Sequence, residues 1–296
     1  MTISRRGFLL GGGALGLLAV GGGYELVEQG VLPGRIRLNA MLGQDGPPPP
    51  VPDVSPGPMV SGSFTSTARA GTEVGWTVAY PPGSDSHAKL PVCVALHGRY
   101  ATHAWMFDSL SLQYYLADAV VNQGVPPFAI ASVDGGDATN WHPRASGDNP
   151  QAMVIDEFVP MLARRGLRTD HFGLWGWSLG GYGALLLATV LGSARIDAVV
   201  ASSPALWRSP GETAPDVFDS PADFERNNVY TREAQLAGIP LRIDIGDNDS
   251  FTPAVEQFRQ ELTPTPAGGV SHGFHDAAYW MRVAPAEIEF LGSHLT

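Results

Sequence analysis

The hexapeptide GWSLGG, residues 176–181, follows directly after the apolar run HFGLW at residues 171–175, and together they decide the fold. A short apolar run predicts a buried strand. The pattern GxSxG indicates a sharp turn from such a strand into a helix, with the serine exposed at the tip of the turn. A side chain at Gly176 or Gly180 would collide where this turn doubles back. Ser178 is therefore the candidate nucleophile.

The residues after the serine support this interpretation. The stretch LGGYGALLLATVLG, residues 179–192, has small residues on one side and an apolar stripe, which is typical of a helix packed closely on a sheet. A glycine-rich turn with a helix-capping serine is the alternative. The strand before and the helix after favour the nucleophile turn.

A serine at such a turn requires an acid and a histidine later in the chain, on loops after strands. The run IPLRIDI, residues 239–245, predicts a strand, and GDNDSF follows it as a loop. This segment offers Asp244, Asp247 and Asp249. We rank Asp244 last because its side chain would point into the packing of the sheet. Spacing leaves Asp247 and Asp249 open, since either could also shape the turn or cap the next helix.

Two histidines follow this acidic loop at a suitable distance. The segment GGVSHGFHDAAYW, residues 268–280, predicts a short strand, a turn and a helix that begins near Asp276. His275 falls on the loop and His272 in or beside the strand, so His275 is the favoured base. His294 is expected beyond the last helix, as a solvated tail residue.

The residues that would stabilise an oxyanion come from two places. The run PVCVAL, residues 91–96, predicts a buried strand that ends in HGRY. Hydrolases with this turn take one backbone amide from the loop after that strand and one from the residue after the serine. These amides are Arg99 and Leu179. His97 precedes the serine in the chain, and we expect it to position the loop.

Taken together, these motifs resemble the esterase D, S-formylglutathione hydrolase and antigen 85 branch of the α/β-hydrolases. The resemblance covers about residues 61–296. It rests on HG at residues 97–98, DEFVP at residues 156–160 as a helix start, GWSLGG, IDIGDNDSF and GFHDAAYW. It implies that Asp249 is the acid and His275 the base. The sequence HGR replaces the glycine-leucine of many relatives, which affects substrate preference more than chemistry because only the backbone amide is used.

The order of the predicted elements agrees with this resemblance. Strands are expected at residues 72–80, 91–96, 128–133, 171–175, 196–202 and 241–245 and near Val270, with helices between most of them. This alternation predicts an α/β-hydrolase fold, with a mainly parallel sheet covered by helices on both faces.

The segment 204–228 lacks a clear period and is rich in Pro, Asp and Ser. We expect an irregular cap beside the active site, because loops of this kind often shape binding pockets. Trp207 and Phe218 are its candidate substrate-binding residues. They could equally anchor the segment to the core, since aromatic side chains serve both purposes.

The N-terminus predicts export. The sequence SRRGFLL, residues 4–10, leads into an apolar run that ends at Gly23, which resembles a twin-arginine signal over residues 1–23. A Sec signal or a bare N-terminal membrane anchor are the alternatives. The 16 residues from Phe8 to Gly23 are fewer than the roughly 20 that span a bilayer. The expected location is therefore extracytoplasmic, either secreted or associated with the cell envelope.

Residues 24–60 are expected to form an arm and a proline-rich linker. The run QDGPPPPVPDVSPGPMV, residues 44–60, favours extended polyproline geometry and a semi-rigid spacer. Residues 61–296 then form one catalytic domain.

Composition excludes several classes of protein. The net charge of −11 and the lack of a basic run argue against binding to nucleic acid or to an anionic membrane. The single cysteine, Cys93, lies in an apolar strand and is expected to be a buried hydrophobe. No metal-binding or nucleotide-binding pattern is present, so we expect no metal and no cofactor. His142 with Asp137 lacks the spacing of a metal site.

The predicted function is a serine esterase that hydrolyses carboxylic esters of small molecules or lipids through an acyl-enzyme. One alternative is an acyltransferase similar to antigen 85, which would move the acyl group to a sugar or alcohol. Another is a non-catalytic binding protein of the cell envelope, which the filled positions for serine, acid and histidine disfavour.

Overall fold

The computed structural model describes residues 35–44, 46–136 and 140–295. Its contacts divide the chain into two compact units, residues 1–46 and 47–296. In the first unit the described residues form one helix, α2 (Arg35–Met41). The predicted export signal, with Arg5 and Arg6, lies outside the described residues. Within the described ranges, we find no helix with the length and apolar character needed to span a membrane.

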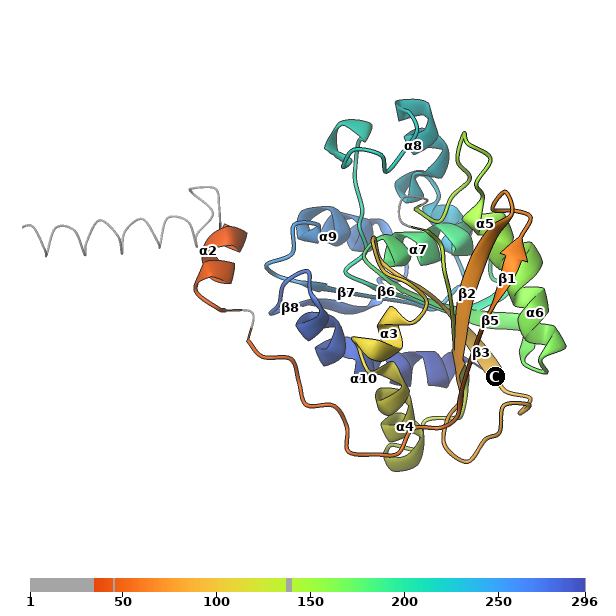
Figure 1. The fold of residues 1–296 in the computed structure, drawn as a ribbon. Helices are drawn as coiled ribbons and strands as arrows, with labels where there is room; N and C mark the ends of the chain where they lie inside the picture. Colours follow the sequence, from red (N-terminus) through yellow and green to blue (C-terminus); the bar gives the residue numbers. More distant parts are fainter. Residues whose placement is uncertain (1–34, 45, 137–139, 296) are drawn as a thin grey trace, which may run out of the picture. The chain divides into compact units, whose positions relative to one another are not determined.

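The second unit is built on a sheet of eight strands in the order β1-β2-β4-β3-β5-β6-β7-β8 (Figure 1). The strands are β1 (Met59–Ser66), β2 (Thr72–Ala79), β3 (Pro91–Leu96), β4 (Ala129–Val133), β5 (Arg168–Trp177), β6 (Ile196–Ser202), β7 (Leu241–Gly246) and β8 (Ala267–Ser271). The pairs β1–β2 and β2–β4 are antiparallel. All other pairs are parallel, so the predicted mainly parallel sheet is confirmed.

Strand β1 is missing from the strands predicted from the sequence. It pairs with β2 along its whole length, from Met59 opposite Ala79 to Ser66 opposite Thr72. Its sequence is MVSGSFTS, and only Ser66 in it is buried. An edge strand that buries so little carries few apolar residues, and its sequence therefore lacks the pattern of a core strand. The proline-rich stretch before it, residues 46–58, contains no helix or strand.

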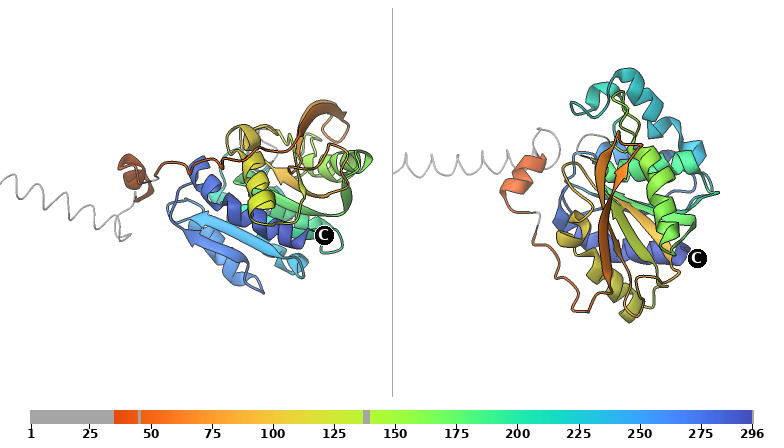
Figure 2. Two further views of the ribbon diagram at one scale, coloured as in Figure 1. Left: turned by 90° about the horizontal axis from the view of Figure 1, so that it is seen from below. Right: turned by 45° about the vertical axis from the view of Figure 1, so that its right-hand side comes forward.

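Helices cover both faces of the sheet. They are α3 (Trp105–Asp108), α4 (Leu112–Asn122), α5 (Pro150–Ala152), α6 (Val159–Arg164), α7 (Leu179–Leu191), α8 (Pro221–Asn227), α9 (Thr252–Glu261) and α10 (Ala277–His294). Helices α4 and α10 lie on one face and α7 on the other (Figures 1 and 2). Strand β3 shows how the sheet separates two cores, because Val92, Val94 and Leu96 enter the α7 core while Cys93 and Ala95 enter the α4–α10 core.

Two predicted helix boundaries are wrong. The helix expected to start at residues 156–160 begins at Pro150, where the Asn149 side chain accepts a hydrogen bond from the Ala152 amide at 2.9 Å. Asp156 lies inside a π-helical segment, Met153–Phe158. His294 is not beyond the last helix but in its final turn, where its Nδ1 donates to the Phe290 carbonyl at 2.7 Å.

The segment expected to form an irregular cap is irregular for most of its length. It also contains the short helix α8, which begins after Ser220, whose hydroxyl accepts from the Asp223 amide at 3.1 Å. Val217 and Ala205 from this segment form a small buried cluster with Leu179, the residue after the candidate nucleophile. The segment therefore packs directly beside the nucleophile turn.

Candidate active site

Ser178 lies where β5 turns into α7. Its backbone is strained, with φ 56° and ψ −125°, a conformation that non-glycine residues seldom adopt. Three hydrogen bonds hold it there: the Ser178 amide donates to the Ser202 carbonyl at 3.0 Å, and the Ser178 carbonyl accepts from Ala205 at 3.0 Å and from Tyr182 at 3.1 Å. The turn thereby presents the hydroxyl above the ends of the parallel strands.

The flanking glycines are required by close approach of backbones. A Cβ atom at Gly176 would lie 2.1 Å from the Gly180 carbonyl oxygen. A Cβ atom at Gly180 would lie 1.9 Å from the carbonyl oxygen of Leu96, at the end of β3. Any side chain at these positions would push the turn away from β3, and with it the serine away from the loop that follows β3.

The structure brings Ser178, His275 and Asp249 together from three separate loops. The Ser178 hydroxyl is 2.8 Å from His275 Nε2, and His275 Nδ1 is 2.6 Å from Asp249 Oδ2. An ionised carboxylate only accepts, so Nδ1 carries the proton and Nε2 is left to accept from the serine. The second oxygen of Asp249 accepts from the Phe251 amide at 2.9 Å, and the Asp249 side chain is 0% exposed.

The other two aspartates have different partners. Asp247 accepts from the Gly273 amide at 3.1 Å, and its Oδ1 is 3.3 Å from Nδ1 of His272, whose side chain is 58% exposed. Asp244 lies buried in β7, where the Arg242 guanidinium donates to it at 2.6 Å. Of the two aspartates that spacing left open, Asp249 is the one that contacts His275.

Backbone hydrogen bonds join the loop after β7, which carries Asp249, to the loop after β8, which carries His275. The Asp247 amide donates to the Ser271 carbonyl at 2.8 Å, and the Asn248 amide donates to the Gly273 carbonyl at 2.9 Å. Asp276 then begins α10 as predicted, because its side chain accepts from the Tyr279 amide at 2.9 Å. His275 is thus held between a fixed loop and a capped helix.

Arg99 and Leu179, whose amides are the predicted oxyanion donors, lie close together in the structure. Both residues line a small cavity beside the serine, together with Gly98. Neither amide has a hydrogen-bond partner among the residues that the structure describes. Leu179 is also the first residue of α7, and the partial positive charge of a helix N-terminus favours an anion there. The two free N–H groups can therefore hold a developing oxyanion.

His97 orients the Arg99 amide. Its Nε2 accepts from the Gly135 amide at 2.9 Å, so the proton is on Nδ1, which donates to the Gly98 carbonyl at 2.7 Å. The Gly98 carbonyl and the Arg99 N–H belong to the same trans peptide and point in opposite directions. Fixing the carbonyl on one side therefore fixes the N–H on the other. This agrees with the predicted role of His97 in positioning the loop.

Asp134, at the end of β4, holds the far end of this loop, and sequence reasoning missed it. It accepts from the His103 amide at 2.6 Å, from His103 Nδ1 at 2.9 Å and from the Gly75 amide at 3.0 Å. Burial alone would raise the pKa of Asp134, but the hydrogen bonds from His103 bring it below its ordinary value. The only signal in the sequence is a lone aspartate after an apolar strand.

A cavity of about 320 Å³ opens beside the serine. Its lining residues come from the loop after β3, from α3, from the nucleophile turn, and from α10 and the loop before it. They are Gly98, Arg99, Tyr100, Ala101, Trp105, Trp177, Ser178, His275 and Trp280. The sequence analysis did not single out its tryptophans, because each lies in a different segment of the chain.

The predicted substrate-binding residues Trp207 and Phe218 do not line this cavity. Phe218 stacks on the buried ring of His142, with centroids 5.0 Å apart and planes 15° apart, so it anchors the segment to the core. Trp207 packs edge to face on Phe251 at 5.4 Å, and Phe251 is itself 5.4 Å from His275. A role in substrate binding stays a prediction for both.

Within the described residues, no cluster of His, Cys, Asp or Glu is arranged to hold a metal ion. Asp137 lies outside these residues, and His142 Nε2 is instead 3.2 Å from Asp223 Oδ2. Burial lowers the pKa of His142 below its ordinary value. Cys93 is fully buried, as predicted, and burial raises the pKa of its thiol. Neither residue has the environment of a reactive group.

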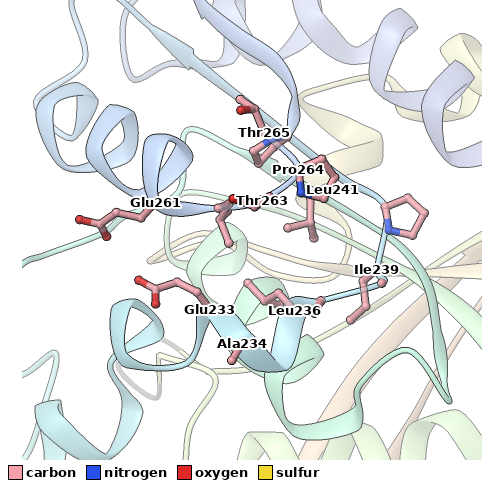
Figure 3. A pocket seen from close by; sticks show the side chains of 14 residues that line it. Glu233, Ala234, Leu236, Ile239, Leu241, Glu261, Thr263, Pro264 and Thr265 are labelled. Carbon is pink, nitrogen blue, oxygen red and sulfur yellow. The ribbon is translucent and has the colours of Figure 1, made fainter.

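A second cavity, of about 250 Å³, lies away from the triad (Figure 3). Its wall includes Glu233, Leu236, Glu261 and Pro264, and it contains none of the candidate catalytic side chains. Burial, and then the charge of Glu261, raises the pKa of Glu233. No histidine lines this second cavity, whereas Ser178 and His275 line the first, so the cavity at Ser178 is the candidate active site.

Comparisons with known proteins agree with the fold. The model of the "putative esterase" family matches residues 67–280. A solved ferulic acid esterase has a TM-score of 0.70 and 19% identity, with 80% of this chain and 98% of that chain covered. The S-formylglutathione hydrolase of Agrobacterium tumefaciens has a TM-score of 0.63 and 17% identity over 80% of this chain and 95% of its own.

The fluorophosphonate-binding serine hydrolase F of Staphylococcus aureus has a TM-score of 0.66 and 17% identity, covering 80% and 99% of the two chains. At such low identity these structures show a shared fold. Among curated proteins, none matches this sequence.

Proposed function

Because the family model spans residues 67–280, this chain belongs to the putative esterase family, and we propose that it is an exported serine esterase that cleaves carboxylic esters through an acyl-enzyme. The membership makes the protein a hydrolase. The proposal of a serine esterase rests mainly on the position of His275, which lies 2.8 Å from the Ser178 hydroxyl and 2.6 Å from Asp249.

The proposed reaction has two halves. His275 Nε2 takes the proton of Ser178 as Oγ attacks the ester carbonyl, and the amides of Arg99 and Leu179 hold the oxyanion. His275 then gives this proton to the departing alcohol, which leaves the acyl group on Ser178. In the second half a water molecule, activated by the same nitrogen, attacks the acyl-enzyme and releases the acid. Asp249 keeps Nδ1 protonated and stabilises the imidazolium in both halves.

The acyltransferase alternative uses the same intermediate but requires a bound acceptor alcohol in place of water. A sugar acceptor presents many hydroxyl groups, and each needs a hydrogen-bond partner once it is desolvated. Apart from Ser178 and His275, the side chains of the cavity that can hydrogen-bond are Arg99 and the tryptophans, which only donate, and Tyr100, which can also accept. This lining favours hydrolysis over transfer to a sugar.

Export by the twin-arginine route remains part of the proposal and rests on the sequence SRRGFLL at residues 4–10. The double variant Arg5→Lys with Arg6→Lys keeps the charge, so a Sec signal would tolerate it while twin-arginine recognition would fail. Normal export of this variant would contradict the twin-arginine route without affecting the proposed chemistry.

The chemistry is tested by steady-state hydrolysis of a series of ethyl esters of increasing acyl length, with Ser178→Ala as the matched control. We expect turnover of at least one ester by the wild-type protein and a loss of about 10⁴-fold or more in the variant, since the covalent route is removed. Retention of a tenth of the activity in Ser178→Ala would overturn the assignment of the nucleophile.

A further inference from the structure

The cavity beside Ser178 has three tryptophans in its wall, contributed by three separate elements. Trp105 comes from α3, Trp177 from the end of β5 and Trp280 from α10. The Trp105 and Trp177 rings are stacked, with centroids 5.2 Å apart, and Trp280 meets Trp105 edge to face at 5.8 Å. Trp177 and Trp280 are buried, whereas Trp105 is half-buried. The proposed mechanism uses none of these rings.

These indoles border the reacting atoms. A Cβ atom built on Gly98 would lie 3.2 Å from Trp177 Nε1 and 3.3 Å from Ser178 Cβ, so this edge of Trp177 lies against the same glycine as the serine. Trp280 packs edge to face on His275, with ring centroids 5.2 Å apart. A substrate that reaches the serine through this cavity therefore passes beside the tryptophan rings, of which Trp105 is the most exposed.

The chemistry of the wall selects a flat apolar ring. Aromatic rings pair with indoles by stacking or edge-to-face contact, and this contact stabilises the pair beyond what the burial of apolar area contributes. A sugar ring would leave hydroxyl hydrogens without acceptors, because outside Ser178 and His275 the guanidinium of Arg99 and the indole N–H groups only donate, and Tyr100 is the remaining side-chain acceptor of the wall. An aliphatic chain would bury area but gain no ring contact.

The position of His275 decides which part of the ester enters the cavity. His275 must donate its proton to the leaving oxygen, so the alcohol begins beside Nε2. Trp280 packs on that imidazole. Of the two oxyanion residues, Arg99 borders this cavity, whereas Leu179 lines a separate small cavity with Gly136, Asn140 and Trp141. We infer that the tryptophan-lined cavity binds the alcohol part of the substrate and that this alcohol carries an aromatic ring. The inference rests on the proposed esterase function.

A pair of acetate esters tests the inferred preference for an aromatic alcohol in the wild-type protein. Benzyl acetate and cyclohexylmethyl acetate share the acyl group and place their rings one methylene from the ester oxygen, so the two esters have similar intrinsic reactivity. We expect kcat/KM to be about tenfold higher for benzyl acetate, which corresponds to ~1.4 kcal/mol. Benzyl alcohol should also inhibit at a lower concentration than cyclohexylmethanol, and this readout needs no variant.

A second pair distinguishes the two sides of the ester. Methyl phenylacetate and methyl cyclohexylacetate carry the same two rings on the acyl side, and we expect their kcat/KM values to agree within about twofold. A preference for the aromatic ring on this side alone would overturn the assignment to the alcohol.

Variants connect the preference to the cavity. Trp105→Ala should abolish the preference for benzyl acetate mainly by raising KM, and Trp105→Phe should retain most of it. Phe290→Ala is the matched control, because Phe290 packs from α10 against the same core but does not line the cavity, and it should keep the preference.

The outcome separates this inference from the proposed function. Equal rates on both acetates, in a protein whose Ser178 reacts with a fluorophosphonate, would overturn the aromatic alcohol and leave the esterase standing. Failure of Ser178 to react with that reagent would overturn the proposed function itself.

Discussion

Two aspartate–histidine pairs lie side by side in the loops that follow β7 and β8, and they differ in what surrounds them. Asp249 and His275 are 2.6 Å apart, and their side chains are 0% and 28% exposed. Asp247 and His272 are 3.3 Å apart, and their side chains are 37% and 58% exposed. The sequence places all four residues within the same two loops. Only the first pair has a fully buried aspartate and a histidine that contacts Ser178, so the burial of the acid and the third partner distinguish a candidate catalytic pair from a surface ion pair.

The histidines provide the largest expected contrast. His275→Ala removes the imidazole nitrogen that lies 2.8 Å from the Ser178 hydroxyl and can accept its proton, so we expect kcat to fall by about 10⁴-fold. His272→Ala removes an exposed side chain and should change kcat by less than about twofold, since exposed ion pairs contribute little. Steady-state ester hydrolysis by both variants, with circular dichroism to check folding, measures the contrast. Equal losses would remove the distinction between the pairs.

The aspartates should give a smaller contrast in the same direction. Asp249→Asn leaves an amide that cannot stabilise the imidazolium and can favour the wrong tautomer, so we expect a loss of about 10³–10⁴-fold in kcat. Asp247→Asn keeps a carbonyl oxygen that can accept from the Gly273 amide, and we expect less than about a tenfold loss. A larger loss in Asp247→Asn would show that Asp247 is the acid.

A third histidine, His97, extends the comparison to a residue that acts through the backbone. His97→Leu removes the Nδ1 donor at 2.7 Å from the Gly98 carbonyl, while the Ala101 amide at 3.3 Å remains. We expect kcat to fall by about 10–100-fold with little change in KM, which is less than the full loss of an oxyanion donor. His97→Asn keeps a donor near the position of Nδ1 and should recover part of kcat. If KM rose instead while kcat stayed constant, His97 would belong to substrate binding.

Glu287 is a buried carboxyl group that contacts neither Ser178 nor the two aspartate–histidine pairs. It is fully buried in α10, and it accepts from Ser202 at 2.6 Å and from Trp175 at 3.1 Å. Burial, and then the charge of Asp244, raises the pKa of Glu287 well above its ordinary value. An acid whose pKa is raised on folding binds more protons in the folded state, so stability is highest below the unfolded pKa of about 4.3 and falls as the pH rises towards the folded pKa.

Glu287→Gln should therefore flatten the dependence of the melting temperature on pH above about pH 5, even if it lowers the temperature itself by removing the acceptor for Trp175. Thermal melts of the wild type and the variant between pH 5 and pH 9 measure the two slopes. Identical slopes would show that Glu287 does not carry this pH dependence.

Much of the fold could be predicted because the parallel strands are buried on both faces. Strands such as PVCVAL in β3 and IDAVVAS in β6 are nearly unbroken apolar runs, and the turn at Ser178 fixes where one of them ends. Strand β1 and the start of the helix at Pro150 were missed, because the first buries one residue and the second depends on a local cap by Asn149.

The order of motifs along the chain predicts part of the site, but it does not predict which side chains meet in three dimensions. Ser178 and the two loops follow from motifs, but a choice between Asp247 and Asp249 needs to know which carboxylate faces the imidazole, and that is a tertiary contact. The cavity is lined by three tryptophans, Trp105, Trp177 and Trp280, which lie up to 175 residues apart in the sequence. No local sequence pattern therefore predicts this cavity. Trp207 and Phe218 are predicted as substrate-binding residues because they lie in an irregular segment. The irregularity of a segment does not show which of its side chains line a cavity.

We propose that Ser178 is activated by Asp249–His275, the pair with the buried aspartate, and not by the more exposed pair Asp247–His272. The most direct test is the rate at which a fluorophosphonate modifies the protein, followed by intact mass and peptide mapping in the wild type, His275→Ala and His272→Ala. We predict a single adduct on Ser178. It should form at nearly the wild-type rate in His272→Ala and at least about 10³-fold more slowly in His275→Ala. An adduct on another residue, or equal slowing in the two variants, would contradict it.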